Sequence, residues 1–219
     1  SIEWKIATFY NLGMDSVKLD KDGIKPIEEY LKKIDVISSK DDVLKTIAEF
    51  HRLGISSSFA IFGSADRENS KMEIAYLYQG GLGLPNRDYY TADDARSIEI
   101  REEYKKHIDK MFDLFKINNT KSEAISKIIF DFEYKLADNS MTNLELRDPY
   151  ATTNRMSQSE LNEISPDFNF ETYFSYIKLP QQEVVNVSQP KFFKEFNNVF
   201  KNTDIETWKL YLKWNLIRT

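Results

Sequence analysis

Helix-start signals recur along this chain and constrain its fold more than any other feature. In each signal a hydroxyl side chain precedes an acidic residue by three positions. The hydroxyl can accept a hydrogen bond from a free backbone N–H in the first turn of a helix, and the acid favours the positive end of the helix dipole. Glycine and proline, which interrupt helices, number only 7 and 6 in 219 residues. The signals begin at Ser39, Thr91, Thr120, Ser157 and Thr203.

Apolar residues recur at intervals of three and four, which predicts a mainly helical protein. In the longest predicted helix, residues 92–116, the apolar stripe includes Tyr104 and Ile108 and gives the helix one buried face. The predicted helices span residues 2–17, 25–35, 40–53, 92–116, 121–138, 157–164, 169–178, 190–201 and 204–218.

One region has the composition of β-strands. Residues 55–63 and 71–79 are rich in β-branched and aromatic residues and flank a polar connector, a pattern that predicts a β-hairpin. The first run carries apolar groups on both faces, Phe59 on one and Phe62 on the other, so we expect both faces to be covered. The predicted fold class is mainly α, a multi-helix lobe with a small β-hairpin or sheet near residues 55–79.

Charge and cysteine content exclude several classes of protein. The 30 basic and 35 acidic residues are interleaved along the chain, whereas a nucleic-acid-binding protein usually carries a basic stripe. No apolar stretch approaches the roughly 18 to 20 residues of a membrane-spanning helix. The absence of cysteine excludes disulfides, thiolate metal sites and cysteine nucleophiles within these residues.

Neither histidine belongs to a zinc-binding motif. His51 and His107 lie in different predicted helices, beside apolar stripes, and no His-Glu-x-x-His sequence is present. We therefore expect core or boundary histidines. The glycine-rich run at residues 80–83 lacks the residues that complete a phosphate-binding loop or a dinucleotide-binding fingerprint. The residues themselves yield no catalytic group and no metal ligand.

The run at residues 80–90, GGLGLPNRDYY, resembles the signature GL-x-LP-x-RDYY in the N-terminal region of neprilysin-like zinc metallopeptidases. This family includes the endothelin-converting enzymes and the bacterial oligopeptidase O. Residues 7–15, 55–66, 147–161 and 210–214 resemble further family segments in the expected order, so the resemblance covers nearly the whole chain. The matching residues of the signature are Gly81, Leu84, Pro85, Arg87, Asp88, Tyr89 and Tyr90.

The resemblance implies a two-lobed enzyme whose lobes enclose a cavity that admits short peptides, and a zinc-bound water that attacks the peptide bond. Residues 1–219 would be an internal fragment of the N-terminal peptidase region, supplying the helical wall of the cavity and the small sheet. The family's zinc-binding helix follows this region, so the resemblance places zinc in the parent enzyme, assigns no cofactor, catalytic residue or metal ligand to this chain, and predicts that the chain alone is inactive. It also implies a periplasmic, extracellular or membrane-anchored setting.

The partners implied are the rest of the peptidase chain, with its catalytic domain, and short peptide substrates; nucleic acid and membrane contacts are not expected from this segment. Apolar surface left without its partner segments should cause self-association, or a noncovalent complex with the rest of the enzyme. The alternative is a stand-alone, non-catalytic helical module that binds peptides or other proteins.

The Arg87-Asp88-Tyr89-Tyr90 sequence is interpreted as structural, a hydrogen-bonded junction that holds the hairpin against the following long helix. Direct contact between Arg87 and substrate is the second hypothesis.

Overall fold

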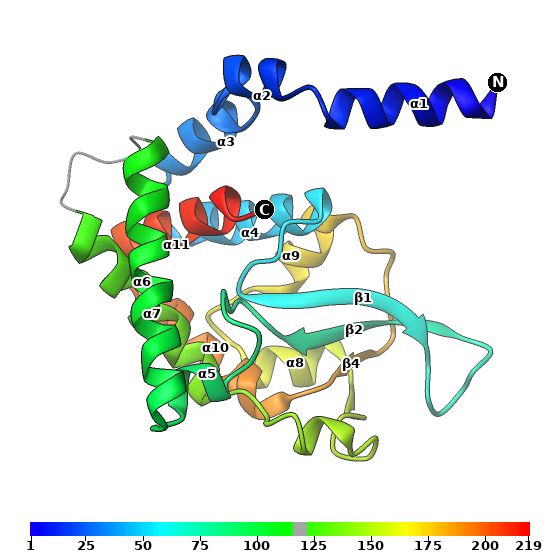
Figure 1. Ribbon diagram of the computed structural model, residues 1–219. Coiled ribbons are helices and arrows are strands. Elements are labelled where there is room, and N and C mark those ends of the chain that lie inside the picture. The colour runs from blue at the N-terminus through cyan, green and yellow to red at the C-terminus, as the bar shows by residue number, and fades with distance from the viewer. Residues whose placement is uncertain (116–121) are drawn as a thin grey trace.

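The computed structural model of the chain, which describes residues 1–115 and 122–219, combines many helices with a small sheet whose hairpin projects beyond them (Figure 1). The predicted fold class, mainly α with a small sheet, is confirmed. The helices are α1 (Ile2–Gly13), α2 (Ser16–Asp22), α3 (Lys25–Asp35), α4 (Lys40–Leu53), α5 (Asp88–Thr91), α6 (Ala95–Phe115), α7 (Ser122–Asp138), α8 (Gln158–Ile164), α9 (Phe170–Ile177), α10 (Pro190–Asn202) and α11 (Ile205–Ile217), with a short 3₁₀ turn η1 (Glu145–Arg147).

Several helices begin at the predicted signals. Ser39 and Ser157 each accept a hydrogen bond from the third backbone N–H of their helix, and the acid at that position returns a bond to the cap, which makes two complete capping boxes. At α11 the cap is Asp204, whose side chain accepts from the Thr207 N–H, so the predicted signal at Thr203 is displaced by one residue. The signal at Thr120 lies outside the described residues.

One predicted helix is divided in the structure, and another begins later than predicted. The predicted helix 2–17 is α1 followed by α2, because Asp15 leaves the helical conformation and caps α2 through the Lys18 N–H. The predicted helix 92–116 is preceded by the short α5 and begins as α6 at Ala95. Residues 116 and 121, which the prediction placed at helix ends, are outside the described part of the chain.

The hairpin belongs to a four-stranded sheet. Strands β1 (Phe59–Ala65) and β2 (Glu73–Gln79) pair antiparallel, as predicted. The sheet continues through β4 (Val185–Val187), parallel to β2, to β3 (Arg155–Met156), in the order β1-β2-β4-β3. The sequence analysis missed β3 and β4, because strands of two or three residues are too short to show alternation.

The expectation that both faces of the hairpin are covered is wrong for β1. Phe59 is 1% exposed, but Phe62 is 47% exposed and stacks on Tyr76 with ring centroids 5.5 Å apart. The central residues of β2 are buried, since this strand has neighbours on both sides. The edge strand β1 therefore presents an apolar side chain at the surface.

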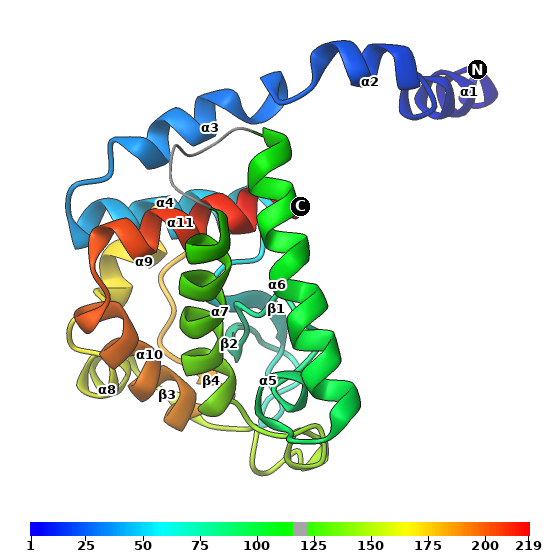
Figure 2. The same cartoon turned by 60° about the vertical axis from the view of Figure 1, so that its left-hand side comes forward.

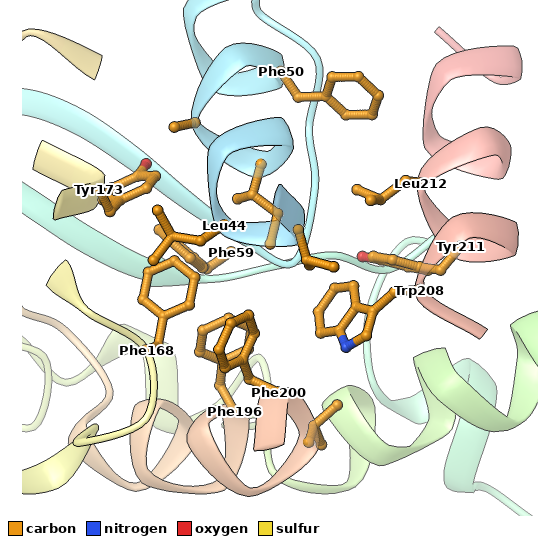
Figure 3. Packing of buried hydrophobic residues seen from close by; sticks show 14 of the residues in the cluster. Leu44, Phe50, Phe59, Phe168, Tyr173, Phe196, Phe200, Trp208, Tyr211 and Leu212 are labelled. Atoms are coloured by element: carbon orange, nitrogen blue, oxygen red, sulfur yellow. The ribbon is translucent and has the colours of Figure 1, made fainter. Parts of the chain in front are cut away.

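Phe59 is the centre of the main hydrophobic core. Its ring makes edge-to-face contacts with Tyr173, Phe193 and Phe196 at centroid distances of 5.3 to 5.5 Å. Figure 3 shows Phe168 and Phe196 of this cluster below α4, with Trp208 and Tyr211 of α11 on the other side of the cluster. The aromatic residues of segments 168–176 and 192–200 thus contribute chiefly to a core.

Helix α11 joins two hydrophobic clusters. Trp208, Tyr211 and Leu212 belong to the main core, while Trp214 and Ile217 pack in a second cluster with α6 and α7. A helix with apolar residues on most of its faces is expected to lie inside a domain, which is the position of α11.

Helices α1 and α2 contrast with the rest of the structure because neither contains a buried residue. They form an arm, residues 1–22, that extends away from the other helices in both views (Figures 1 and 2).

Truncation of Phe59 tests the position of the main core. Phe59→Ala removes a fully buried ring and should lower the free energy of unfolding by about 3–5 kcal/mol. Phe62→Ala, on the same strand but half exposed, should cost less than about 1 kcal/mol. Urea unfolding of the two variants measures the difference; equal losses would contradict the assigned core.

Candidate functional site

The segment that carries the predicted motif, residues 80–90, connects the end of β2 to α5 and then to α6. Figure 2 shows α6 and α7 side by side, with α5 near one end of both. The motif segment therefore leads from the sheet into α5, which contacts α6 and α7, and α7 in turn contacts α11.

Gly81 is held between the start of β1 and α11. Its carbonyl accepts a hydrogen bond from the Tyr211 hydroxyl at 2.8 Å, and the same hydroxyl accepts from the Ser58 N–H at 2.9 Å. Gly81 has φ +80°, and an added Cβ would lie 2.6 Å from the Tyr211 oxygen. Both the backbone conformation and the close approach therefore require glycine here.

The Tyr90 hydroxyl is the central group of the motif segment. It accepts hydrogen bonds from the N–H groups of Gly83 and Leu84, at 3.0 and 2.9 Å, and donates to Glu133 Oε2 of α7 at 2.8 Å. The hydroxyl thus uses both lone pairs and its proton. The Tyr90 side chain of α5 therefore hydrogen-bonds both to the loop that precedes α5 and to α7.

Glu133 accepts a second hydrogen bond, from a tyrosine of α6. The Tyr104 hydroxyl donates to the same oxygen, Oε2, at 2.8 Å, and accepts from the indole N–H of Trp214 at 2.8 Å. Gly83 approaches so closely that an added Cβ would lie 1.7 Å from the Tyr104 hydroxyl oxygen. We call these six residues, Gly83, Leu84, Tyr90, Tyr104, Glu133 and Trp214, the Glu133 junction.

The buried position controls the charge of Glu133. Loss of hydration raises the pKa of its carboxyl group to about 7, although the Arg218 guanidinium and the two tyrosine hydroxyls oppose the shift. Burial, and next the neighbouring Glu133 charge, raise the pKa values of Tyr90 and Tyr104. The other carboxylate oxygen, Oε1, has no hydrogen-bond partner among the described residues.

Two arginines fasten the backbone around the junction. Arg218, which follows α11, donates to the Leu82 carbonyl at 2.8 Å. Arg101 of α6 donates to the carbonyls of Tyr90 and Ala92 at 3.0 and 2.7 Å. Both cations therefore stabilise the motif segment through its carbonyl groups.

The predicted motif residues differ in how deeply they are buried. Gly81 and Tyr90 are buried and hydrogen-bonded in the interior, and Leu84 is half buried beside the second cluster. Arg87 and Tyr89 are half buried, whereas Pro85 and Asp88 are exposed; the backbone N–H of Asp88 donates to Asn86 Oδ1. The side-chain hydrogen bond between the motif segment and α7 thus comes from Tyr90, and within residues 1–115 and 122–219 the side chains of Arg87 and Asp88 make no hydrogen bond to the helices.

The sequence analysis missed Glu133, although a signal for it exists. Glu133 lies on the same face of α7 as Ile125, Ile129 and Leu136, all of which are buried. An acidic residue within an apolar stripe indicates a buried carboxylate with dedicated hydrogen-bond donors.

His51 is a boundary histidine, as predicted. Its Nδ1 lies 2.5 Å from the Tyr173 hydroxyl and its Nε2 lies 2.8 Å from the Ser57 carbonyl, and burial lowers the pKa of the imidazole. The His107 ring packs edge-on against Trp214. Within residues 1–115 and 122–219 no three histidine, aspartate or glutamate side chains are grouped so as to hold a metal ion.

Comparison with known proteins decides the family. The sequence model described as Peptidase family M13 matches residues 1–219. The chain belongs to peptidase family M13. The resemblance to the neprilysin-like N-terminal region is thereby confirmed.

Relatives within the M13 family are much longer than this chain. The chain is 26% identical to mouse endothelin-converting enzyme 1 over 99% of its own length and 29% of that protein, and 26% identical to Drosophila melanogaster neprilysin-3 over 99% and 30%. It therefore spans about 30% of the length of these relatives.

Solved structures of M13-like proteins share the fold. The zinc metalloprotease ZMP1 of Mycobacterium tuberculosis superposes with a TM-score of 0.87 at 22% identity, over 94% of this chain and 31% of that one. PepO from Lactobacillus rhamnosis gives a TM-score of 0.70 at 15% identity, over 90% and 31%.

The raised pKa of Glu133 predicts a pH-dependent stability. The folded state holds the carboxyl proton more tightly than the unfolded chain, whose reference pKa is 4.5, so the free energy of unfolding should fall as pH rises from about 4.5 to about 7. At about 1.4 kcal/mol per pH unit, the full contribution is roughly 3 kcal/mol. Glu133→Gln should remove this contribution.

Urea unfolding between pH 5 and 8 measures the Glu133 contribution as the difference in the free energy of unfolding between wild type and Glu133→Gln. The exposed Glu163→Gln of α8 serves as the control and should leave the pH profile unchanged. A difference between wild type and Glu133→Gln that stays constant across this range would show that Glu133 titrates normally.

Gly83→Ala tests the close packing at the junction. The added methyl group must displace the Tyr104 hydroxyl, and we expect a loss of at least about 2 kcal/mol in the free energy of unfolding. Gly63→Ala, where nothing lies within 4 Å of the added Cβ, should change stability by less than about 0.5 kcal/mol. The account of the junction fails if the two variants are equally stable.

Proposed function

We propose that residues 1–219 are part of the N-terminal region of a zinc-dependent metallopeptidase that cleaves short peptides, and that they supply the wall of its substrate cavity and structural support. The observation that carries the proposal is the family match over all 219 residues, combined with relatives about three times as long. ZMP1, which shares the fold, is itself a zinc metalloprotease.

The described residues do not fit a zinc site, since no suitable group of ligands occurs among them. The buried Glu133 carboxylate is occupied by two tyrosine hydroxyls of its own chain. We therefore assign zinc binding and the chemical step to other parts of the parent enzyme. Residues 1–219 by themselves would then be inactive.

The arm of residues 1–22 supports a role within a larger chain. Its large apolar side chains are exposed to solvent, among them Trp4 at 67%, Phe9 at 82% and Val17 at 77%. Exposed apolar groups concentrated in this way usually mark an interaction site. The proposed partner is the remaining portion of the same peptidase chain, which the comparison of lengths calls for.

The alternative, a stand-alone interaction module, would leave these side chains in water when no partner is bound. No helix among the described residues is long and apolar enough to cross a membrane. The periplasmic, extracellular or membrane-anchored setting stays a prediction.

Complementation tests the proposed function. Residues 1–219 and the remaining portion of the peptidase should each be inactive toward a short peptide, and mixing or co-expressing them should restore cleavage that a zinc chelator abolishes. Chelator-sensitive cleavage by residues 1–219 alone would contradict the assignment of the chemistry to the remaining portion.

The fluorescence of Trp4 can show whether the arm is buried in the full-length protein. It is 67% exposed, whereas Trp208 and Trp214 are buried, so iodide should quench mainly Trp4 in the isolated chain. Trp4→Phe should remove most of the quenched fluorescence from the isolated chain but little from the full-length protein, where the arm is covered. An equal reduction in both proteins would mean that the arm remains in solvent.

A further inference from the structure

Strand β1 forms an open edge of the sheet. In the order β1-β2-β4-β3 it pairs with β2 on one side, and among the described residues no strand pairs with its outer side. From Ala60 to Ala65 the strand contains no buried residue, and the hairpin projects from the helices (Figure 1). Seven residues at about 3.4 Å each make this edge roughly 24 Å long.

The pairing of the hairpin shows which backbone groups of β1 point outward. Asp66, directly after β1, donates its backbone N–H to the Met72 carbonyl at 2.8 Å and continues the β1–β2 register. In an antiparallel pair every second residue bonds to the neighbouring strand, and the residues between them point their N–H and C=O groups to the other side. Counted back from Asp66, the outward residues in the middle of β1 are Ile61 and Gly63.

This open edge lacks the features that protect most free strands. Edge strands are commonly very short, or they carry charged residues or proline. Strand β3, at the opposite edge of the sheet, has two residues and includes the charged Arg155. In contrast, β1 has seven residues with the sequence FAIFGSA, without charge or proline, and Phe62 is 47% exposed. We therefore expect the β1 edge to be covered in the complete protein.

The lengths of the relatives indicate where the cover comes from. This chain spans 29% of mouse endothelin-converting enzyme 1 and 31% of the ZMP1 chain. A segment of the same chain would cover β1 at all times, whereas a bound peptide would expose the edge each time it dissociates. Because β1 is uncharged and Phe62 is exposed, the segment that fits is extended and has an apolar residue beside Phe62.

We propose that an extended segment from the remaining portion of the peptidase chain pairs with β1 as a fifth strand. It bonds to the outward backbone groups of Ile61 and Gly63 and packs an apolar side chain beside Phe62. Strand addition of this kind obtains its affinity from main-chain hydrogen bonds and its specificity from alternate side chains. The inference rests on the proposed function, because that function makes residues 1–219 part of a longer peptidase.

Amide hydrogen exchange of the full-length protein, resolved to single residues by mass spectrometry, tests the inference. The N–H groups of Ile61 and Gly63 should exchange at least about 100-fold more slowly than in an unstructured peptide of the same sequence. The N–H groups of Phe62 and Ser64 bond to β2, so they should be protected in either case and serve as internal controls. The inference is overturned if these controls are protected while Ile61 and Gly63 exchange at the unstructured rate.

The conditions under which protection occurs identify the occupant of the edge. A segment of the same chain should protect Ile61 and Gly63 at every protein concentration and without added peptide. Protection that disappears on dilution would mean that a second copy covers the edge. Protection that appears only when a short peptide is added would mean that a ligand covers it. Either of these two results would overturn the inference.

Gly63→Pro distinguishes strand pairing from simple burial. Proline removes the outward N–H of residue 63 and leaves the hydrogen bonds to β2 in place. In the full-length protein the Ile61 N–H should then exchange at least about fivefold faster, while Phe62 stays protected. Gly63→Ala keeps the N–H, and its added Cβ meets nothing within 4 Å among the described residues, so its exchange should match wild type. Unchanged protection of Ile61 in Gly63→Pro would overturn the inference.

Peptide hydrolysis by the same full-length protein separates this inference from the proposed function. Protection of Ile61 and Gly63 in a protein without peptidase activity would support the added strand and contradict the peptidase. Peptidase activity in a protein whose Ile61 and Gly63 exchange freely would support the peptidase and overturn the added strand.

Discussion

The buried carboxylate of Glu133 is the interaction on which the arrangement of this lobe depends. Removing a carboxylate from water costs several kcal/mol unless hydrogen bonds replace its hydration. Here the replacements come from Tyr90 of α5 and Tyr104 of α6, while Glu133 belongs to α7. Three helices must therefore keep their relative positions for the charge to remain satisfied.

Close packing against tyrosine hydroxyls also explains two glycines of the loop at residues 80–83. Gly83 and Leu84 donate their backbone N–H groups to the Tyr90 hydroxyl, which requires the loop to approach Tyr104 closely. Gly81 makes a comparable approach to Tyr211 of α11. The glycine-rich loop thus serves as a contact surface for tyrosine hydroxyls, and its glycines have a steric reason that does not involve a phosphate group.

Residue patterns predicted the parts of the fold that depend on neighbouring residues in the sequence. They failed for the parts that depend on contacts between residues far apart in the sequence. The capping boxes at Ser39 and Ser157 were visible because all their atoms lie within one helical turn. Strands β3 and β4 form only through pairing with residues far away in the sequence, and the exposure of Phe62 depends on which strand forms the edge of the sheet. The family signature located the motif segment, but Glu133, which accepts the hydrogen bond from the Tyr90 hydroxyl, lies on α7, which the signature does not include.

The most direct test of the account is peptide hydrolysis by the full-length protein carrying Tyr90→Phe, measured well below its unfolding temperature. Removal of this hydroxyl takes one donor from Glu133 and should lower the unfolding temperature, while kcat and KM stay within about twofold of wild type because the junction supports the lobe and does no chemistry. A large fall in kcat with an unchanged unfolding temperature would contradict the account and place Tyr90 in the catalytic machinery.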